Sequence, residues 1–106
     1  MTTTAIEMVT YQLKSGVKQS DLNNIHPKVN DFLKAQPGFL YRSMSEDNSG
    51  KMYDIVYWQD MASATKAASA FEKSEAGMAL MAVTDMDSVN MQHMSAITEA
   101  MSCEAS

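Results

Sequence analysis

The sequence predicts an α+β fold of the ferredoxin-like type, in which a four-stranded antiparallel sheet carries its helices on one face. Two observations lead to this prediction: hydrophobic periodicity follows the order β-α-β-β-α-β, and turn-forming residues separate the segments. The chain has 106 residues and a mass of 11.7 kDa, which suits one domain. We therefore expect a single domain over residues 1–106, with its core at 5–98 and a tail at 99–106.

The first third of the chain predicts one strand and one helix. Residues 5–13 are rich in β-formers and stop at Lys14-Ser15-Gly16, which is typical of a strand that ends in a turn. Ser20-Asp21 predicts an N-cap, after which apolar residues recur at spacings of three and four until Pro37. Pro27 lies inside this pattern and predicts a kink or a delayed start of the helix.

The next segment predicts a β-hairpin. Residues 39–44 and 51–58 have strand-like composition, and turn formers fill the six positions between 44 and 51. A turn that is symmetric about Asn48 would pair residues that lie equally far from it. The expected cross-strand partners are then Arg42 with Asp54 as an ion pair, Met44 with Met52, and Leu40 with Val56.

The last part of the core predicts a helix and a fourth strand. Asp60 can cap a second helix with small alanines on its inner face, and Ser74-Glu75 can cap a further turn or two. Asp85-Met86-Asp87-Ser88 breaks this pattern, and residues 89–98 return to an extended segment. In this topology the first strand lies between the third and the fourth.

Both strands of the hairpin carry apolar residues on both faces. Two helices cover only one face of such a sheet, whereas a solvated second face would show a clean alternation of apolar and polar residues. Another copy of the chain is the simplest cover for the second face. We therefore expect a homodimer.

Charge and composition exclude several functions. Thirteen acidic and eight basic side chains give a net charge of −5, which repels phosphate backbones, so we expect no nucleic-acid partner. No stretch approaches the roughly 20 apolar residues of a membrane span, and we see no secretory signal. We expect a cytoplasmic protein without a membrane partner. The single Cys103 lies in the tail and is expected to be a reduced, incidental thiol.

Glu7 and His93 are the first candidate pair for acid–base chemistry. Glu7 interrupts an otherwise apolar central strand, where burial would raise the pKa of its carboxyl. His93 lies on the neighbouring fourth strand and can meet Glu7 across the ladder. Such a pair can act as general acid and base. Glu7 can equally serve as a structural partner of a charged group, so both interpretations stay open.

Arg42, Asp54 and His26 are further candidates. The Arg42–Asp54 pair can simply support the sheet, or it can form a pocket floor where Arg42 stabilises a developing enolate oxygen and Asp54 contacts the substrate. His26 is spaced from apolar positions of the first helix so that it points towards the sheet, as a second acid–base group or a structural hydrogen-bonding residue. No local ligand spacing is typical of a metal site, so we predict no metal.

Aromatic residues and methionines could line a pocket. Trp58 and Tyr57 end the third strand on opposite faces, so one faces the helices and the other the dimer. Trp58 could stack on a substrate and Tyr11 could donate to a ligand carbonyl, although packing is the simpler interpretation of both. The 11 methionines suit a core or a pocket for flat apolar molecules, and core filling is the interpretation that we favour. Phosphate-binding glycine loops and nucleophile elbows are absent from the sequence.

Three stretches of the chain carry a family resemblance. They are Gln36-Pro37-Gly38-Phe39, Tyr53-Asp54-Ile55-Val56-Tyr57-Trp58 and Phe71-Glu72-Lys73-Ser74. With them the chain resembles the dimeric α+β barrel superfamily, and within it the antibiotic biosynthesis monooxygenase-like (ABM) proteins, over residues 5–98. The resemblance implies a homodimeric barrel with a pocket between sheet and helices in each protomer. Members include cofactor-independent quinone-forming monooxygenases, haem-degrading enzymes and lactone isomerases.

The resemblance also bears on cofactors. The haem-degrading members carry a late-helix Trp and a downstream His ligand, whereas this chain has Phe71 and no His in the stretch 78–81. We therefore expect no haem and no other cofactor.

Two functional hypotheses follow. The first is a small-molecule enzyme that resembles cofactor-independent monooxygenases and acts by acid–base chemistry on an apolar oxygenated or aromatic substrate. Its expected catalytic residues are Glu7, His26, His93 and Arg42, and its expected substrate-binding residues are Trp58, Tyr11 and Asp54. The second is a non-catalytic protein that binds a small ligand or serves as a structural dimer. An open cavity that brings these groups together would favour the first.

Overall fold

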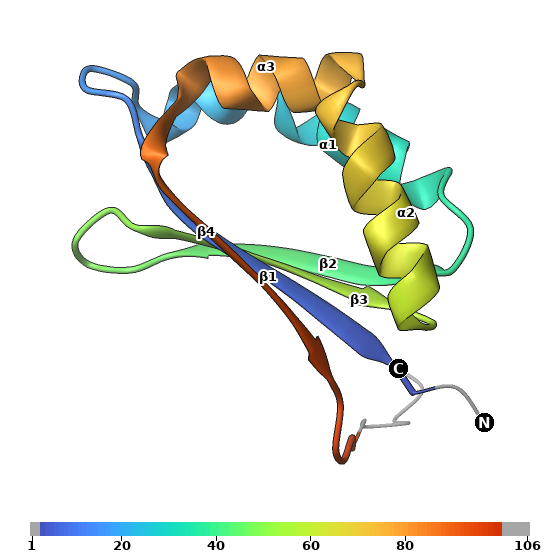
Figure 1. Cartoon of the computed structure of the whole chain (residues 1–106). Coiled ribbons are helices and arrows are strands. Elements are labelled where there is room, and N and C mark those ends of the chain that lie inside the picture. The colour runs from blue at the N-terminus through green and yellow to red at the C-terminus, as the bar shows by residue number, and fades with distance from the viewer. Residues whose placement is uncertain (1–2, 101–106) are drawn as a thin grey trace, which may run out of the picture.

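The structure is a computed structural model that describes residues 3–100, so Cys103 lies outside the described residues. The elements are β1 (Ala5–Leu13), the short 3-10 helix η1 (Gln19–Leu22), α1 (His26–Lys34), β2 (Phe39–Glu46), β3 (Met52–Trp58), α2 (Met61–Glu72), α3 (Glu75–Val83) and β4 (Thr84–Ser95). The helices form one layer over one face of a four-stranded sheet (Figure 1). The expected α+β, ferredoxin-like fold is therefore confirmed, with α2 and α3 in place of a single second helix.

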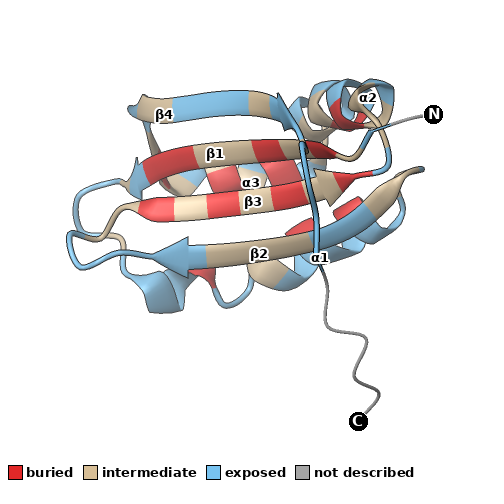
Figure 2. Cartoon of the chain, turned by 90° about the horizontal axis from the view of Figure 1, so that it is seen from below, coloured by how far each residue is buried: buried red, intermediate tan, exposed pale blue. Residues whose placement is uncertain are grey.

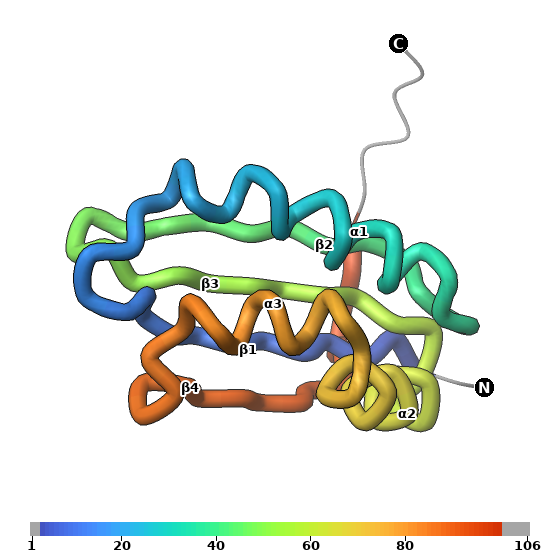
Figure 3. The backbone as a smooth tube through the Cα atoms, turned by 90° about the horizontal axis from the view of Figure 1, so that it is seen from above, coloured from blue at the N-terminus to red at the C-terminus, as the bar shows by residue number. Residues whose placement is uncertain are grey.

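The sheet has the strand order β2-β3-β1-β4, and every neighbouring pair is antiparallel. The predicted position of β1 between β3 and β4 is confirmed. Seen from the helix side, α1 runs along β2 while α3 lies over β3 and β1 (Figure 3). The helices therefore cover the central strands, and β4 forms one edge of the sheet.

The first helix begins later than the capping pattern indicated. Residues at the predicted cap form η1, and α1 starts at His26 with Pro27 in its first turn. Pro is tolerated there because the first amides of a helix have no partner within it. The N-cap predicted at Ser20-Asp21 is therefore wrong, and Pro27 delays the helix rather than kinking it.

The hairpin forms, but its predicted register is wrong by two residues. Arg42 pairs with Val56, and Met44 pairs with Asp54. The predicted pairs, Arg42 with Asp54 and Met44 with Met52, are not formed on the ladder. Because side chains alternate with a period of two, a shift of two residues leaves Arg42, Met44 and Asp54 on their predicted face.

The turn explains this shift. The Asp47 carboxylate accepts hydrogen bonds from the amides of Ser49 and Lys51 at 2.9 and 3.0 Å. These bonds centre the turn one residue later than Asn48. The ladder also shifts between Phe39 and Tyr41, so Leu40 lacks the partner that the symmetric turn predicted.

The second helical region divides at Ser74. Asp60 caps α2 by accepting from the amide of Ser63, and Ser74 caps α3 by accepting from the amide of Gly77. A Cβ atom added at Gly77 would overlap the carbonyl oxygen of Phe71, so the tight passage from α2 to α3 depends on glycine. Both predicted caps are confirmed, and α3 is longer than the expected turn or two.

The sequence predicted a last strand over residues 89–98. In the structure this strand starts earlier, at Thr84, and ends at Ser95. The polar break at 85–88 is an irregularity within the strand, because the register between β1 and β4 shifts there. The Ser88 hydroxyl accepts a hydrogen bond from the Gln12 amide and donates one to the Asp85 carbonyl oxygen. The Ser88 side chain therefore supplies a partner for one amide of β1 at the point where the ladder is irregular.

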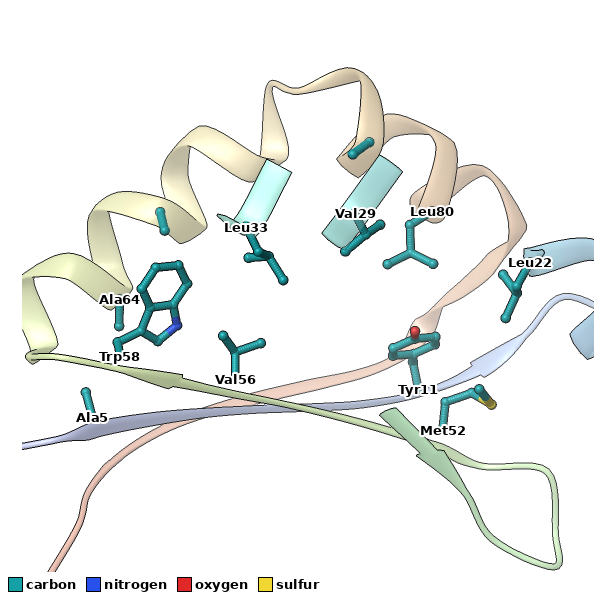
Figure 4. Packing of buried hydrophobic residues seen from close by; sticks show 12 residues of the cluster. Ala5, Tyr11, Leu22, Val29, Leu33, Met52, Val56, Trp58, Ala64 and Leu80 are labelled. Carbon is teal, nitrogen blue, oxygen red and sulfur yellow. The ribbon is translucent and has the colours of Figure 1, made fainter. Parts of the chain in front are cut away.

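Burial is concentrated in β1 and β3, whereas the edge strands are mostly exposed or intermediate (Figure 2). The buried side chains of the inner face include Ala5, Glu7 and Tyr11 of β1 and Met52, Asp54, Val56 and Trp58 of β3. Val29, Leu33 and Leu80 reach down from the helices to meet them (Figure 4). Trp58, which is 0% exposed, therefore faces the helices. The sequence had predicted that either Trp58 or Tyr57 would do so. Among the described residues, no helix has the length and apolar character needed to cross a membrane.

Candidate functional site

A cavity of about 180 Å³ lies between the helix layer and the inner face of the sheet, and its walls are mainly apolar. The strands contribute Glu7, Val9, Tyr11, Arg42, Asp54, Val56, Trp58, Thr84, Met86, Val89 and Met91, and the helices contribute Val29, Leu33, Ala67, Ala68, Phe71, Glu72, Leu80 and Met81. The chain therefore has a cavity where the resemblance implied a pocket.

One row of side chains crosses the inner face of the sheet. Arg42 pairs with Val56, Val56 with Glu7, and Glu7 with His93. Neighbouring strands lie about 4.8 Å apart, so the row spans about 15 Å. Within this row, Glu7 lies between the apolar Val56 and His93. His93 is its only hydrogen-bond partner among the described residues.

Glu7 and His93 form a hydrogen-bonded pair, as the sequence predicted. Glu7 Oε2 lies 3.1 Å from His93 Nε2, and the two side chains are 10% and 24% exposed. Burial raises the pKa of the Glu7 carboxyl, and His93 opposes this shift without cancelling it. Glu7 lines the cavity, whereas His93 stands behind it and does not. The pair therefore connects the cavity to the more exposed edge of the sheet.

Arg42 and Asp54 form a buried bidentate ion pair despite the shifted register. Arg42 Nε and Nη2 donate to the two Asp54 oxygens at 2.9 and 2.7 Å, and the side chains are only 7% and 11% exposed. Arg42 Nη1 donates to Asn30 Oδ1 of α1 at 2.8 Å. Although burial works against the charge, the Asp54 hydrogen bonds raise the pKa of Arg42. The guanidinium is therefore fixed by three hydrogen bonds to protein oxygens at the cavity wall.

Two buried donors on the cavity wall have poor partners. Trp58 Nε1 has no hydrogen-bond partner among the described residues, and Figure 4 shows this nitrogen on the side of the indole that faces Val56. The Tyr11 hydroxyl meets only the sulfur of Met44, at 3.9 Å. Burial raises the pKa of Tyr11 well above its ordinary value, so the hydroxyl is a donor rather than a phenolate. Both groups could donate to an oxygen of a bound molecule.

His26 is not brought to the cavity. It is the first residue of α1, is half-buried and is absent from the cavity lining. Burial, and then the positive charge of Arg42, lower its pKa. The structure therefore brings Glu7, Arg42, Asp54, Tyr11 and Trp58 to one cavity, with His93 behind Glu7 and His26 outside.

The residues of the site that sequence reasoning missed include Asn30 and Glu72. Asn30 holds Arg42 from α1, and Glu72 lines the cavity from the end of α2. Neither residue lies in a recognisable motif, since their positions depend on how the helices pack on the sheet. For Asn30, the usable signal was its spacing of three residues from the inward-facing Leu33, which makes the two side chains neighbours on the helix surface.

Solved structures share this fold. A variant of SnoaB, a cofactor-independent oxygenase from Streptomyces nogalater, matches with a TM-score of 0.70 and 13% identity over 91% of this chain and 95% of its own. A protein of unknown function from Nitrosomonas europaea matches with a TM-score of 0.68 and 14% identity over 96% and 97%. Rv0793 from Mycobacterium tuberculosis matches with a TM-score of 0.69 and 11% identity over 92% and 99%.

This chain has the fold of these proteins. The resemblance to monooxygenase-like proteins that the sequence indicated is thereby confirmed for the architecture. No family model and no curated protein matches the chain. Identities this low establish the fold, so the chemistry has to be argued from the cavity itself.

Proposed function

We propose that this protein is a small-molecule enzyme that binds a neutral, flat, oxygenated substrate in the cavity and removes a proton from it with Glu7. The observation that carries the proposal is that Trp58 lines the cavity while its buried N–H has no hydrogen-bond partner among the described residues. A buried donor without an acceptor costs free energy. A carbonyl or phenolic oxygen of the substrate would supply that acceptor.

The charges of the lining favour a neutral substrate. Its ionisable groups are the carboxyls of Glu7, Asp54 and Glu72 and the guanidinium of Arg42, besides the Tyr11 phenol. Because Arg42 is already paired with Asp54, no cation among the described lining residues remains to neutralise a phosphate or carboxylate. The net charge of −5 also repels anions. An apolar ring with one or two oxygens suits such walls.

Glu7 has the properties of a general base. A raised carboxyl pKa brings its proton affinity closer to that of a weakly acidic substrate near neutral pH. The proton taken from the substrate can pass to His93, whose side chain is more exposed than that of Glu7. SnoaB is a cofactor-independent oxygenase. By analogy, the substrate anion formed here would itself react with dioxygen.

Anthrone tests the proposal. It is neutral and flat, carries one carbonyl oxygen, and loses a proton from its methylene group to give a phenolate-type anion. Reaction with one dioxygen gives anthraquinone and one water. We expect the protein to accelerate anthraquinone formation and dioxygen uptake over the rate in buffer. Glu7→Gln should lower this rate by about 100-fold or more, because a positioned base contributes about 10²–10⁴-fold.

The matched control is Glu75→Gln, which removes a carboxyl whose side chain is 86% exposed on α3. This variant should keep the wild-type rate, and His93→Ala should lower the rate less than Glu7→Gln does. A protein that binds anthrone without accelerating its oxidation would be a binding protein, as the second hypothesis holds. A Glu7→Gln variant with the wild-type rate would show that Glu7 is not the base.

We also propose that a second copy covers the outer face of the sheet, which no helix of the described chain covers (Figure 1). The apolar side chains of that face include Ile6, Met8, Ile55 and Tyr57, which are half-buried, and Tyr41, which is 58% exposed. Light scattering should give twice the 11.7 kDa of one chain. Ile55→Lys should give monomers, because a charge at the centre of an apolar interface is costly to desolvate.

A further inference from the structure

The cavity opens at the β4 edge of the sheet. Three of its lining residues are exposed, namely Glu72, Met86 and Met91, and the two methionines are 50% and 47% exposed. A side chain that lines a cavity and also meets solvent lies at the opening. Since Glu72 ends α2 and both methionines belong to β4, the opening lies between β4 and the helices.

A third methionine, Met81 of α3, lines the cavity and is half-buried. Met91 sits at a regular inward position opposite Val9, whereas Met86 lies in the irregular segment of β4. Such irregularities commonly re-aim a side chain. Two elements therefore direct thioether side chains to the same cavity.

We propose that Met81, Met86 and Met91 form a ligand-contacting rim, through which an apolar ring enters the cavity and against which it rests. The proposal rests on the proposed function only in assuming that such a ligand occupies the cavity. Methionine suits this role because its unbranched chain adapts to differently shaped rings, and its sulfur makes favourable contacts with aromatic rings. A bound ring would also cover apolar surface that β4 now exposes to water.

Single exposed methionines on a surface are ordinary and need no function. Met78 is such a residue, because it is 61% exposed on α3 and does not line the cavity. It provides a matched control for the rim, since it has the same side chain on the surface without access to the cavity.

Prodan, a neutral, flat naphthalene ketone, is a suitable probe. Its fluorescence shifts to the blue in apolar surroundings, and it accepts excitation energy from tryptophan. Trp58 is the only tryptophan of the chain and lies on the cavity wall, so energy transfer reports binding near the cavity. The wild-type protein, the double variant Met86→Gln/Met91→Gln and the control Met78→Gln would be titrated. A second double variant, Met86→Leu/Met91→Leu, keeps the apolar surface and checks that the rim tolerates substitution.

We expect the glutamine double variant to bind prodan about tenfold more weakly than the wild type, since two polar amides replace apolar side chains against the ring. The leucine double variant and Met78→Gln should bind within about threefold of the wild type. Wild-type binding with an unchanged glutamine double variant would overturn the rim and leave the cavity proposal intact. A wild-type protein that does not bind prodan would overturn both.

Discussion

The buried ion pair of Arg42 and Asp54 makes Asp54→Asn the most informative single change for stability. Asparagine keeps the shape of the side chain and one acceptor oxygen but removes the charge. The variant loses one of the two charge-assisted hydrogen bonds, which are 2.9 and 2.7 Å long, and leaves a guanidinium that is 7% exposed without a counter-charge. Breaking a buried pair in this way costs about 3–5 kcal/mol, of the roughly 5–15 kcal/mol that stabilise a domain.

Urea unfolding followed by circular dichroism measures this cost. At a slope of about 2 kcal/mol per M, a loss of 3 kcal/mol moves the midpoint down by about 1.5 M. The matched control is Glu75→Gln, which breaks the pair with Lys28, where the side chains are 52% and 86% exposed and 3.4 Å apart. Such an exposed pair contributes about 0–1 kcal/mol. If Asp54→Asn costs no more than this control, the assignment of Arg42 and Asp54 as a tightly coupled buried pair is wrong.

Three further predictions concern the cavity and the helix layer. Glu7→Gln should become more stable relative to the wild type as the pH rises from about 4 to 7. The unfolded Glu7 ionises near pH 4.3, whereas burial holds its folded pKa higher, so ionisation of this carboxyl lowers the stability of the wild type but not that of the variant. Urea midpoints at several pH values would show it, and a constant difference would contradict it. Trp58→Phe keeps an aromatic wall but removes the N–H. It should weaken the binding of the flat ketone fluorenone about fivefold, as measured by calorimetry. Unchanged affinity would argue against a hydrogen bond from Trp58. Gly77→Ala should lower the free energy of unfolding by about 1–3 kcal/mol, because its Cβ would overlap the Phe71 carbonyl oxygen; a neutral effect on thermal unfolding would contradict this.

The hairpin shows how far local sequence reasoning reaches. Strand-like composition located both strands, but Asp47, Asn48 and Ser49 are all turn formers, and composition alone does not rank them. The Asp47 carboxylate decides the centre of the turn. The predicted contact between Arg42 and Asp54 nevertheless forms, because a shift of two residues keeps both side chains on one face and arginine is long enough to reach a diagonal neighbour.

The sequence likewise predicts some features of the candidate site but not others. The pairing of Glu7 with His93 could be predicted, because it requires only the strand order and an approximate register. The cavity and its rim could not, since they depend on where α2 and α3 rest on the sheet. His26 was predicted to point towards the sheet from the first helix, but Pro27 moves the start of α1 to His26 itself. Methionines favoured as core filler include Met86 and Met91, which are half exposed at the opening.

The most direct test of the account is a crystal structure of the protein with fluorenone, a flat ketone that Glu7 cannot deprotonate. We expect the ring to lie between Val56 and the helices, with its oxygen about 3 Å from Trp58 Nε1 and its edge beside Glu7. Fluorenone bound on the outer face of the sheet, or lying in the cavity while Trp58 Nε1 stays without an acceptor, would contradict the proposal that this cavity is the substrate site.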